Sequence, residues 1–205
     1  DRAEPGARGP GSISAASDRL CREVGDINAH AHLMADGRPL PQTLTIPAAA
    51  RVIVGFWKTP LGRPMLRERA RGFVECELNA GVTTLRCLGE YDNEAITLGR
   101  DSETGRWSGP RITASGPLLA TTGGHGAELG LARVVDAPWE GRKAVRQNLH
   151  LGATSIKIAA TGGVTDAKVV GEAGRPQMTV EEMTAICEEA HSAGVLVAAH
   201  AQSPE

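Results

Sequence analysis

Hydrophobic and polar residues follow a repeated unit along this chain, in which a helical pattern leads to a glycine and then to a short β-rich run. The unit occurs three times, at residues 78–88, 150–160 and 191–200. Gly81, Gly152 and Gly194 each stand where a residue in the left-handed conformation commonly ends a helix. Each glycine is therefore predicted to separate a helix from a strand that starts at the next residue.

Two further strands bring the predicted total to about five. One covers residues 110–116, and it follows Gly109 without a clear helix ahead of it. The other runs from Glu23 to His30 and leads into the segment His-Ala-His. Strands that alternate with helices predict an α/β fold with a parallel sheet.

Three helices are predicted between these strands. The first covers residues 64–80, and the second begins at Pro138 and runs to about Leu151. The third begins after Thr179, which forms a capping-box pattern with Glu182. The apolar residues of the third helix recur on one face, which comprises Val180, Met183, Ile186, Cys187 and Ala190.

Length and composition limit what this fold can be. The chain has 205 residues, whereas a closed (β/α)₈ barrel typically needs about 250. Residues 1–23 are rich in Gly, Pro, Ser, Ala and Arg and are expected to form a flexible N-terminal segment. The regular pattern occupies residues 24–205, which are predicted to form the folded domain.

Charge and cysteine usage exclude several classes of protein. The net charge is −2, and the chain has only three Trp, one Tyr and two Phe, so neither a nucleic acid nor an anionic membrane is an expected partner. No apolar run is long enough to cross a bilayer. The four cysteines are scattered and form no CxxC pair, which favours a reducing, cytoplasmic setting.

Candidate chemistry lies where strands end. His30 and His32 are two residues apart, so in a strand both imidazoles face the same side and can bind one metal ion. An H-x-H pair also occurs by chance, so this signal is weak alone. His200 ends the apolar strand 195–199, where barrel enzymes place functional residues, although a structural histidine is an alternative there.

Two further candidates lie inside a strand and a glycine-rich loop. Lys157 alternates with Ile156 and Ile158, so it faces a barrel lumen if the isoleucines pack against helices. A buried lysine amine is neutral more readily and can capture CO₂ as a carbamate, whereas the simpler alternative is an amine that reaches solvent. His125 lies in the segment TTGGHG, where the glycines allow the backbone to approach a ligand closely. The alternative is that this segment is only a flexible loop.

The order of these residues resembles the amidohydrolase superfamily of metal-dependent hydrolases. The resemblance rests on VGDINAHAHL (24–33), GVTTLR (81–86), GPRITASGPLLATTGGHG (109–126), IKIAATGGV (156–164) and the segment 172–203. It is closest to the branch of imidazolonepropionase-like enzymes and metal-dependent Xaa-Pro dipeptidases. It implies a partial TIM-type (β/α)₈ barrel containing about the first five β/α units.

The resemblance also implies the roles of the candidate residues. His30 and His32 would hold the more buried of up to two divalent ions, most typically zinc. The carbamate of Lys157 would bridge the ions, and His200 would bind the second. His125 would contact the carbonyl or carboxylate of a small-molecule or dipeptide substrate. A bridging hydroxide would then attack an amide, Xaa-Pro or N-acyl amino acid bond.

Some features of the family pattern are missing from this sequence. Asn28 replaces the usual aspartate of the opening motif. No counterpart is found for a later histidine ligand or for the aspartate that acts as general base, so the general base is expected to be absent from this chain. We therefore expect a truncated chain, or one that assembles with a second copy or a complementary chain. The alternatives are an inactive α/β fragment that only binds metal or assembles, and a different metal-dependent barrel such as a phosphoesterase.

Overall fold

The structure, a computed structural model, describes residues 25–33, 46–164, 167 and 169–203. Its strands are β1 (Asp26–Ala31), β2 (Val82–Cys87), β3 (Arg111–Ala114), β4 (Leu118–Ala120), β5 (Ala132–Val134), β6 (Ser155–Ala159) and β7 (Leu196–His200). Its helices are α2 (Pro47–Trp57), α3 (Gly62–Asn79), α4 (Glu94–Glu103), α5 (Pro138–Leu151) and α6 (Val180–Ser192). The predicted flexible segment 1–23 lies outside the described residues.

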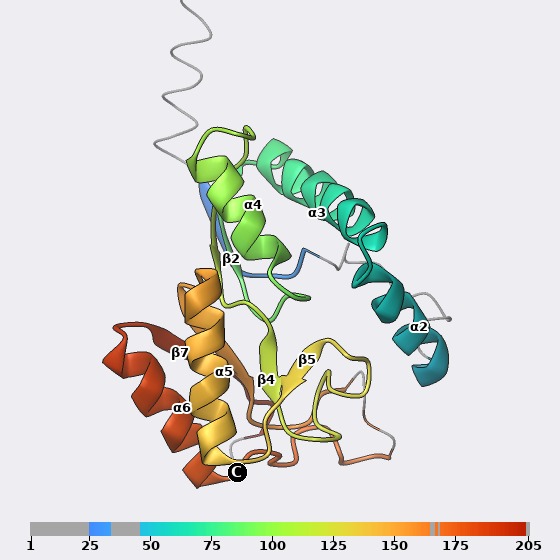
Figure 1. Ribbon diagram of the computed structural model, residues 1–205, viewed down its shortest axis with the longest axis vertical. Coiled ribbons are helices and arrows are strands. Elements are labelled where there is room, and N and C mark those ends of the chain that lie inside the picture. The colour runs from blue at the N-terminus through green and yellow to red at the C-terminus, as the bar shows by residue number, and fades with distance from the viewer. Residues whose placement is uncertain (1–24, 34–45, 165–166, 168, 204–205) are drawn as a thin grey trace, which may run out of the picture.

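All strand pairings between these elements are parallel, as the sequence predicts. One sheet has the order β1-β2-β3, and the other has the order β5-β4-β6-β7. Figure 1 shows the strands as a curved layer with α3 and α4 over one part and α5 and α6 over another. This arrangement is part of a TIM-type α/β barrel. Among the described strands, β1, β3, β5 and β7 each pair with one neighbour only.

The strand predicted at 110–116 is shorter than expected, because the chain bends after Ala114 and resumes as β4. Pro117 lacks an N–H group for strand pairing, and Gly116 has a φ of 67°, which disfavours other residues. The side-chain amide of Asn148 donates hydrogen bonds to the carbonyls of Ser115 (3.2 Å) and Pro117 (3.0 Å). The bend lets the chain pair with β2 before it and with β5 and β6 after it.

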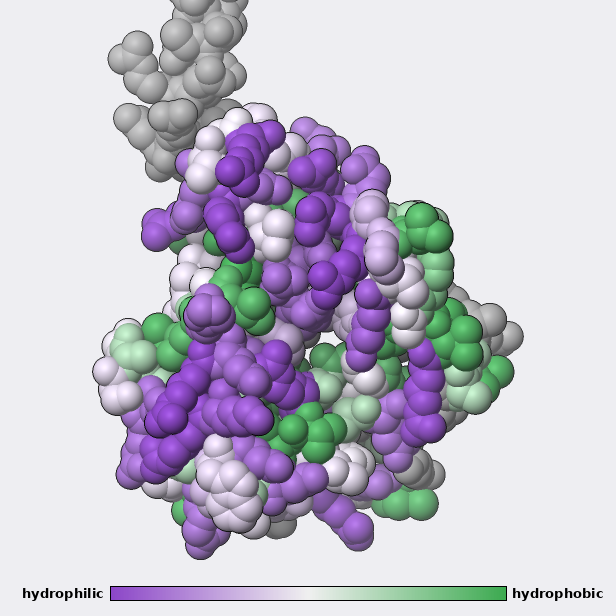
Figure 2. All heavy atoms as spheres, viewed as in Figure 1, coloured by the Kyte–Doolittle hydropathy of each residue, from purple (hydrophilic) through white to green (hydrophobic). Residues whose placement is uncertain are grey.

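The core lies between the curved sheet and the helices. Ile156 and Ile158 of β6 pack in a buried cluster with Val145 of α5 and Ile186 of α6, which confirms the predicted helix-facing side of this strand. A second cluster joins β1–β3 to α3 and α4. The outer faces of α5 and α6 are hydrophilic (Figure 2) and carry ion pairs such as that between Arg146 and Glu189.

Several local predictions are confirmed. The three repeated glycines have positive φ angles of 99°, 104° and 74° for Gly81, Gly152 and Gly194. The capping box is present: the Thr179 hydroxyl accepts from the Glu182 N–H (3.2 Å), and the Glu182 carboxylate accepts from the Thr179 N–H (2.8 Å). Strand β2 begins directly after Gly81, as predicted, whereas β6 and β7 begin three and two residues after Gly152 and Gly194.

Other predictions are wrong or incomplete. The described residues form seven strands rather than five, because β4 and β5 have three residues each and leave little periodicity to detect. Helices α2 and α4 were not predicted, and neither has a side-chain cap at its start. Val180, the first residue of α6, is 70% exposed and does not belong to the buried face of this helix. Within the described residues, none of the helices combines the length and apolar character needed to cross a membrane.

Candidate metal centre

His30 and His32 lie at the carboxyl end of β1, as predicted. Their rings are neighbours, with centroids 4.9 Å apart, and both residues are exposed to solvent. The Asn28 carboxamide oxygen accepts a hydrogen bond from the His30 N–H (3.1 Å), and its NH₂ group donates to Glu77 (3.4 Å). Asn28 can therefore fix the end of the strand in the place of the usual aspartate. Partial loss of solvent lowers the pKa of His30, and His32 and Lys157 add to this effect.

Glu90 is a buried carboxylate beside this pair that the sequence analysis did not identify. It lies three residues after β2 and is only 3% exposed. One carboxylate oxygen accepts the Leu33 N–H at 2.9 Å and lies 3.7 Å from Nδ1 of His32. Histidine ligands of metals usually present their second nitrogen to a carboxylate, carbonyl or water, so Glu90 is placed to orient His32.

Lys157 lies on the inner side of β6 and is 5% exposed. A Cβ at Gly89 would be 3.4 Å from the Lys157 Cγ, so the loop after β2 runs directly against this side chain. Burial lowers the pKa of Lys157, and the positive charge of Arg86 lowers it further. Within the described residues, no carboxylate lies at ion-pair distance from Lys157. A lowered pKa makes the neutral amine, which is the form that reacts with CO₂, more accessible than in a free lysine.

His200 and His125 meet at the carboxyl ends of β7 and β4. Their rings stack with centroids 4.2 Å apart and an interplanar angle of 23°. The position of His200 is fixed by its backbone, since its carbonyl accepts the N–H groups of Ala160 (3.1 Å) and Thr161 (3.2 Å). The TTGGHG segment follows β4 directly, so it lies at the carboxyl end of that strand.

Gln177 connects the two glycine-rich loops around His125. Like Glu90, it was not predicted from the sequence. Its side-chain oxygen accepts the His125 N–H at 2.9 Å. A Cβ at Gly124 would be 3.1 Å from the same oxygen, and a Cβ at Gly163 would be 2.2 Å from Nδ1 of His125. The glycines therefore allow the loops 121–126 and 161–177 to touch, and this contact holds the imidazole of His125.

The predicted residues thus gather at one end of the sheet. The electrostatic influence of His32, Lys157 and His200 reaches His30, so the four predicted ligands share one region. In the described part of the chain, no three His, Cys, Asp or Glu side chains form a group that could hold an ion. The predicted ligand set differs from such a group, because it combines the three histidine imidazoles with the carbamate proposed for Lys157. Imidazole nitrogens and an anionic oxygen donor suit zinc and related divalent ions, so the donor types fit.

Comparison with known proteins identifies the family of this chain. A family profile described as "Amidohydrolase family" matches residues 24–205. The curated ochratoxinase of Aspergillus niger is 30% identical over an alignment of 154 residues. This alignment covers 64% of this chain and 31% of that protein.

Solved structures of the same fold extend this likeness. A Xaa-Pro dipeptidase with methionine bound in its active site superposes with a TM-score of 0.67 at 30% identity, over 86% of this chain and 43% of the other. A prolidase in complex with N-methylphosphonate-L-proline gives 0.69 at 31% identity, over 86% and 42%. The chain thus spans less than half the length of each of these relatives.

Proposed function

The chain belongs to the amidohydrolase family, and from this premise we propose that its protein is a metal-dependent hydrolase of C–N bonds. The observation that carries the proposal is Lys157, a buried amine with a lowered pKa and no carboxylate partner among the described residues. A buried lysine without a charged partner destabilises the fold, and such residues cluster at functional sites. Its place beside the histidines of β1 and β7 supports a role at a metal centre.

His30 and His32 would hold one divalent ion, and His200 would bind a second. Lys157 would supply the anionic bridge: its neutral amine adds to CO₂, forms an N–C bond and releases one proton, which leaves a carbamate with two oxygen donors. When bound, the ions would polarise the scissile carbonyl and lower the pKa of the attacking water. The chain's own residues set the site, since Asn28 fixes the β1 end and Glu90 orients His32.

The substrates we propose are peptides or amides with a free carboxylate, of the Xaa-Pro or N-acyl amino acid type. His125 would contact the substrate carbonyl or carboxylate, because it lies on a loop at the same end of the sheet and stacks on His200. The names of the relatives, a Xaa-Pro dipeptidase, a prolidase and an ochratoxinase, support this class. A small molecule is therefore the expected partner, and the cytoplasmic setting stays a prediction.

The test uses the purified protein after chelation and after reloading with ZnCl₂. We expect about two zinc ions per chain, as implied by the family's site, and release of free amino acid from Xaa-Pro dipeptides or N-acetyl amino acids. The variant His30→Asn should lose zinc, whereas His191→Asn, at the exposed end of α6, should not. Zinc binding without hydrolysis would favour the alternative of a metal-binding chain that needs a complementary chain. The absence of stoichiometric zinc would refute the proposed metal site.

A further inference from the structure

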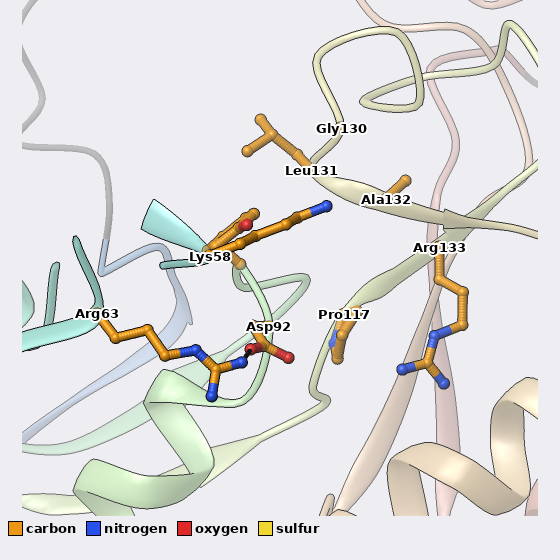
Figure 3. Close-up of a pocket in the computed structure, with 9 residues that line it drawn as sticks. Lys58, Arg63, Asp92, Pro117, Gly130, Leu131, Ala132 and Arg133 are labelled. Carbon is orange, nitrogen blue, oxygen red and sulfur yellow. Dashed lines mark hydrogen bonds and ion pairs between the residues drawn. The ribbon is translucent and has the colours of Figure 1, made fainter. Parts of the chain in front are cut away.

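We propose that a pocket beside the start of β5 binds the oxyanion group, carboxylate or phosphate, of a small molecule. The pocket has a volume of about 390 Å³ and lies between the α2–α3 corner and the start of β5. Lys58, Arg63, Asp92, Pro117, Leu131 and Arg133 line it (Figure 3). In Figure 2 the surface is hollowed at this place. None of the predicted metal ligands lines this pocket, so the inference does not depend on the proposed hydrolase activity.

The charges around the pocket do not balance. Three cationic side chains face one carboxylate, that of Asp92, which already forms an ion pair with Arg63. Among the described residues, no carboxylate forms an ion pair with Lys58 or Arg133. The pocket therefore keeps two positive charges that an anion can neutralise.

The two unbalanced cations are held by neutral groups. The Lys58 ammonium lies 5.9 Å from the centre of the Tyr91 ring, and Figure 3 shows it extended toward Leu131 and Ala132. Arg133 donates to the side-chain oxygen of Gln147 at 2.7 Å. Loss of solvent lowers the pKa of Arg133, so its charge is less well hydrated than that of a free arginine. An oxyanion would restore some of that lost solvation through charge-assisted hydrogen bonds.

The walls of the pocket are built rather than loose. Tyr91 is 4% exposed, and its hydroxyl donates to the Val54 carbonyl at 3.1 Å. The α2–α3 corner is tight, since the Thr59 hydroxyl donates to Phe56 (2.7 Å) and accepts the Gly62 N–H (3.0 Å). A site whose charged groups are held in place loses less entropy when a ligand binds.

The size and lining of the pocket indicate the kind of molecule. A volume of about 390 Å³ is near the lower end of the range for small-molecule sites. Pro117 and Leu131 offer apolar surface between the charged groups. These features suit a small molecule with one anionic group and a short apolar body. A free phosphate ion and a short-chain carboxylate share the required charge and represent the two sources.

The proposal is tested by isothermal calorimetry on the purified protein at constant ionic strength, with inorganic phosphate and butyrate, which has no C–N bond to hydrolyse, as probes. We expect saturable binding of at least one probe, and the tighter one identifies the source. Lys58→Met and Arg133→Met should each weaken it about tenfold, since one charge-assisted hydrogen bond is lost. Lys143→Met and Arg111→Met remove matched charges from exposed positions elsewhere and should leave the affinity unchanged.

A variant with the opposite expected sign protects the test against misfolded proteins. Asp92→Asn removes the only carboxylate among the described residues that line the pocket and releases Arg63 from its ion pair, so it should tighten binding several-fold. Asp92 has a φ of 53°, a conformation that asparagine adopts readily, so the variant is expected to fold. The proposal is overturned if neither probe binds, or if Lys58→Met, Arg133→Met and Asp92→Asn all bind the probe with the affinity of the parent protein.

Discussion

The imidazole of His125 stacks on that of His200, with ring centroids 4.2 Å apart, although 74 other residues separate them in the chain. The stack forms because the loops after β4 and β6 approach each other through glycines, and the last strand, β7, ends beneath them. It joins a predicted substrate-contacting residue to a predicted metal ligand.

Gly163→Ala should disturb this stack from a distance. The new Cβ would lie 2.2 Å from Nδ1 and 2.4 Å from Cε1 of His125, so the ring must move. If His125 contacts the substrate, KM should rise at least about tenfold, as for loss of a charged contact, while zinc content stays unchanged. Gly72→Ala is the control, because its Cβ would meet nothing within 4 Å. Unchanged steady-state kinetics would remove His125 from the substrate site.

Lys157→Met should separate catalysis from stability. Methionine fills a similar volume but cannot form a carbamate, so kcat/KM should fall by about 100-fold or more, as expected when a metal-bridging group is lost. The free energy of unfolding should not fall, because the buried amine has no carboxylate partner within the described residues. Activity of a Lys157→Ala variant should recover partly with added short carboxylic acids. Lys143→Met provides the exposed control. Loss of stability with full activity would assign Lys157 a structural role only.

The sequence predicted those parts of the fold that local signals control. Strands β2, β6 and β7 follow a glycine that must adopt a positive φ, and each is long enough to show its pattern. Strand β5 has only three residues, which is too short to show a pattern, and helix α4 begins without a side-chain cap. The bend at Pro117 depends on Asn148, 31 residues away, so no local pattern contains it.

The same limit applies to the site. The predicted ligands stand at strand ends, and their order along the chain carries the family resemblance. Glu90 and Gln177 act through hydrogen bonds to residues 57 and 52 positions away. A single sequence holds no trace of such pairs, and only the folded chain brings them together.

Asn148→Ala should weaken the fold at the bend between β3 and β4. The side chain is fully buried and donates to the carbonyls of Ser115 and Pro117. Each buried carbonyl left unpaired costs about 1–3 kcal/mol, so the free energy of unfolding should fall by about 2–4 kcal/mol. Chemical denaturation measures it, with the exposed Lys143→Ala of the same helix as control. A change below about 0.5 kcal/mol, the usual effect of a surface substitution, would show that the bend does not need this clamp.

Glu90→Gln should weaken the metal site without removing a ligand. The carboxylate lies 3.7 Å from Nδ1 of His32, and the same oxygen holds the Leu33 N–H. Glutamine keeps an acceptor for Leu33, so the backbone of the β1 end should stay in place. The negative charge of Glu90 favours a proton on Nδ1 of His32, which leaves Nε2 free to bind metal. Glutamine lacks this charge, so zinc affinity should fall about 10- to 100-fold. Competition with a zinc chelator measures this loss. Glu77→Gln is the matched control, because Glu77 touches Asn28 rather than a histidine. If both variants bind zinc as the parent protein does, His32 is oriented without Glu90. If Glu90→Gln alone loses affinity and keeps its unfolding free energy, the carboxylate acts on the ligand and not on the fold.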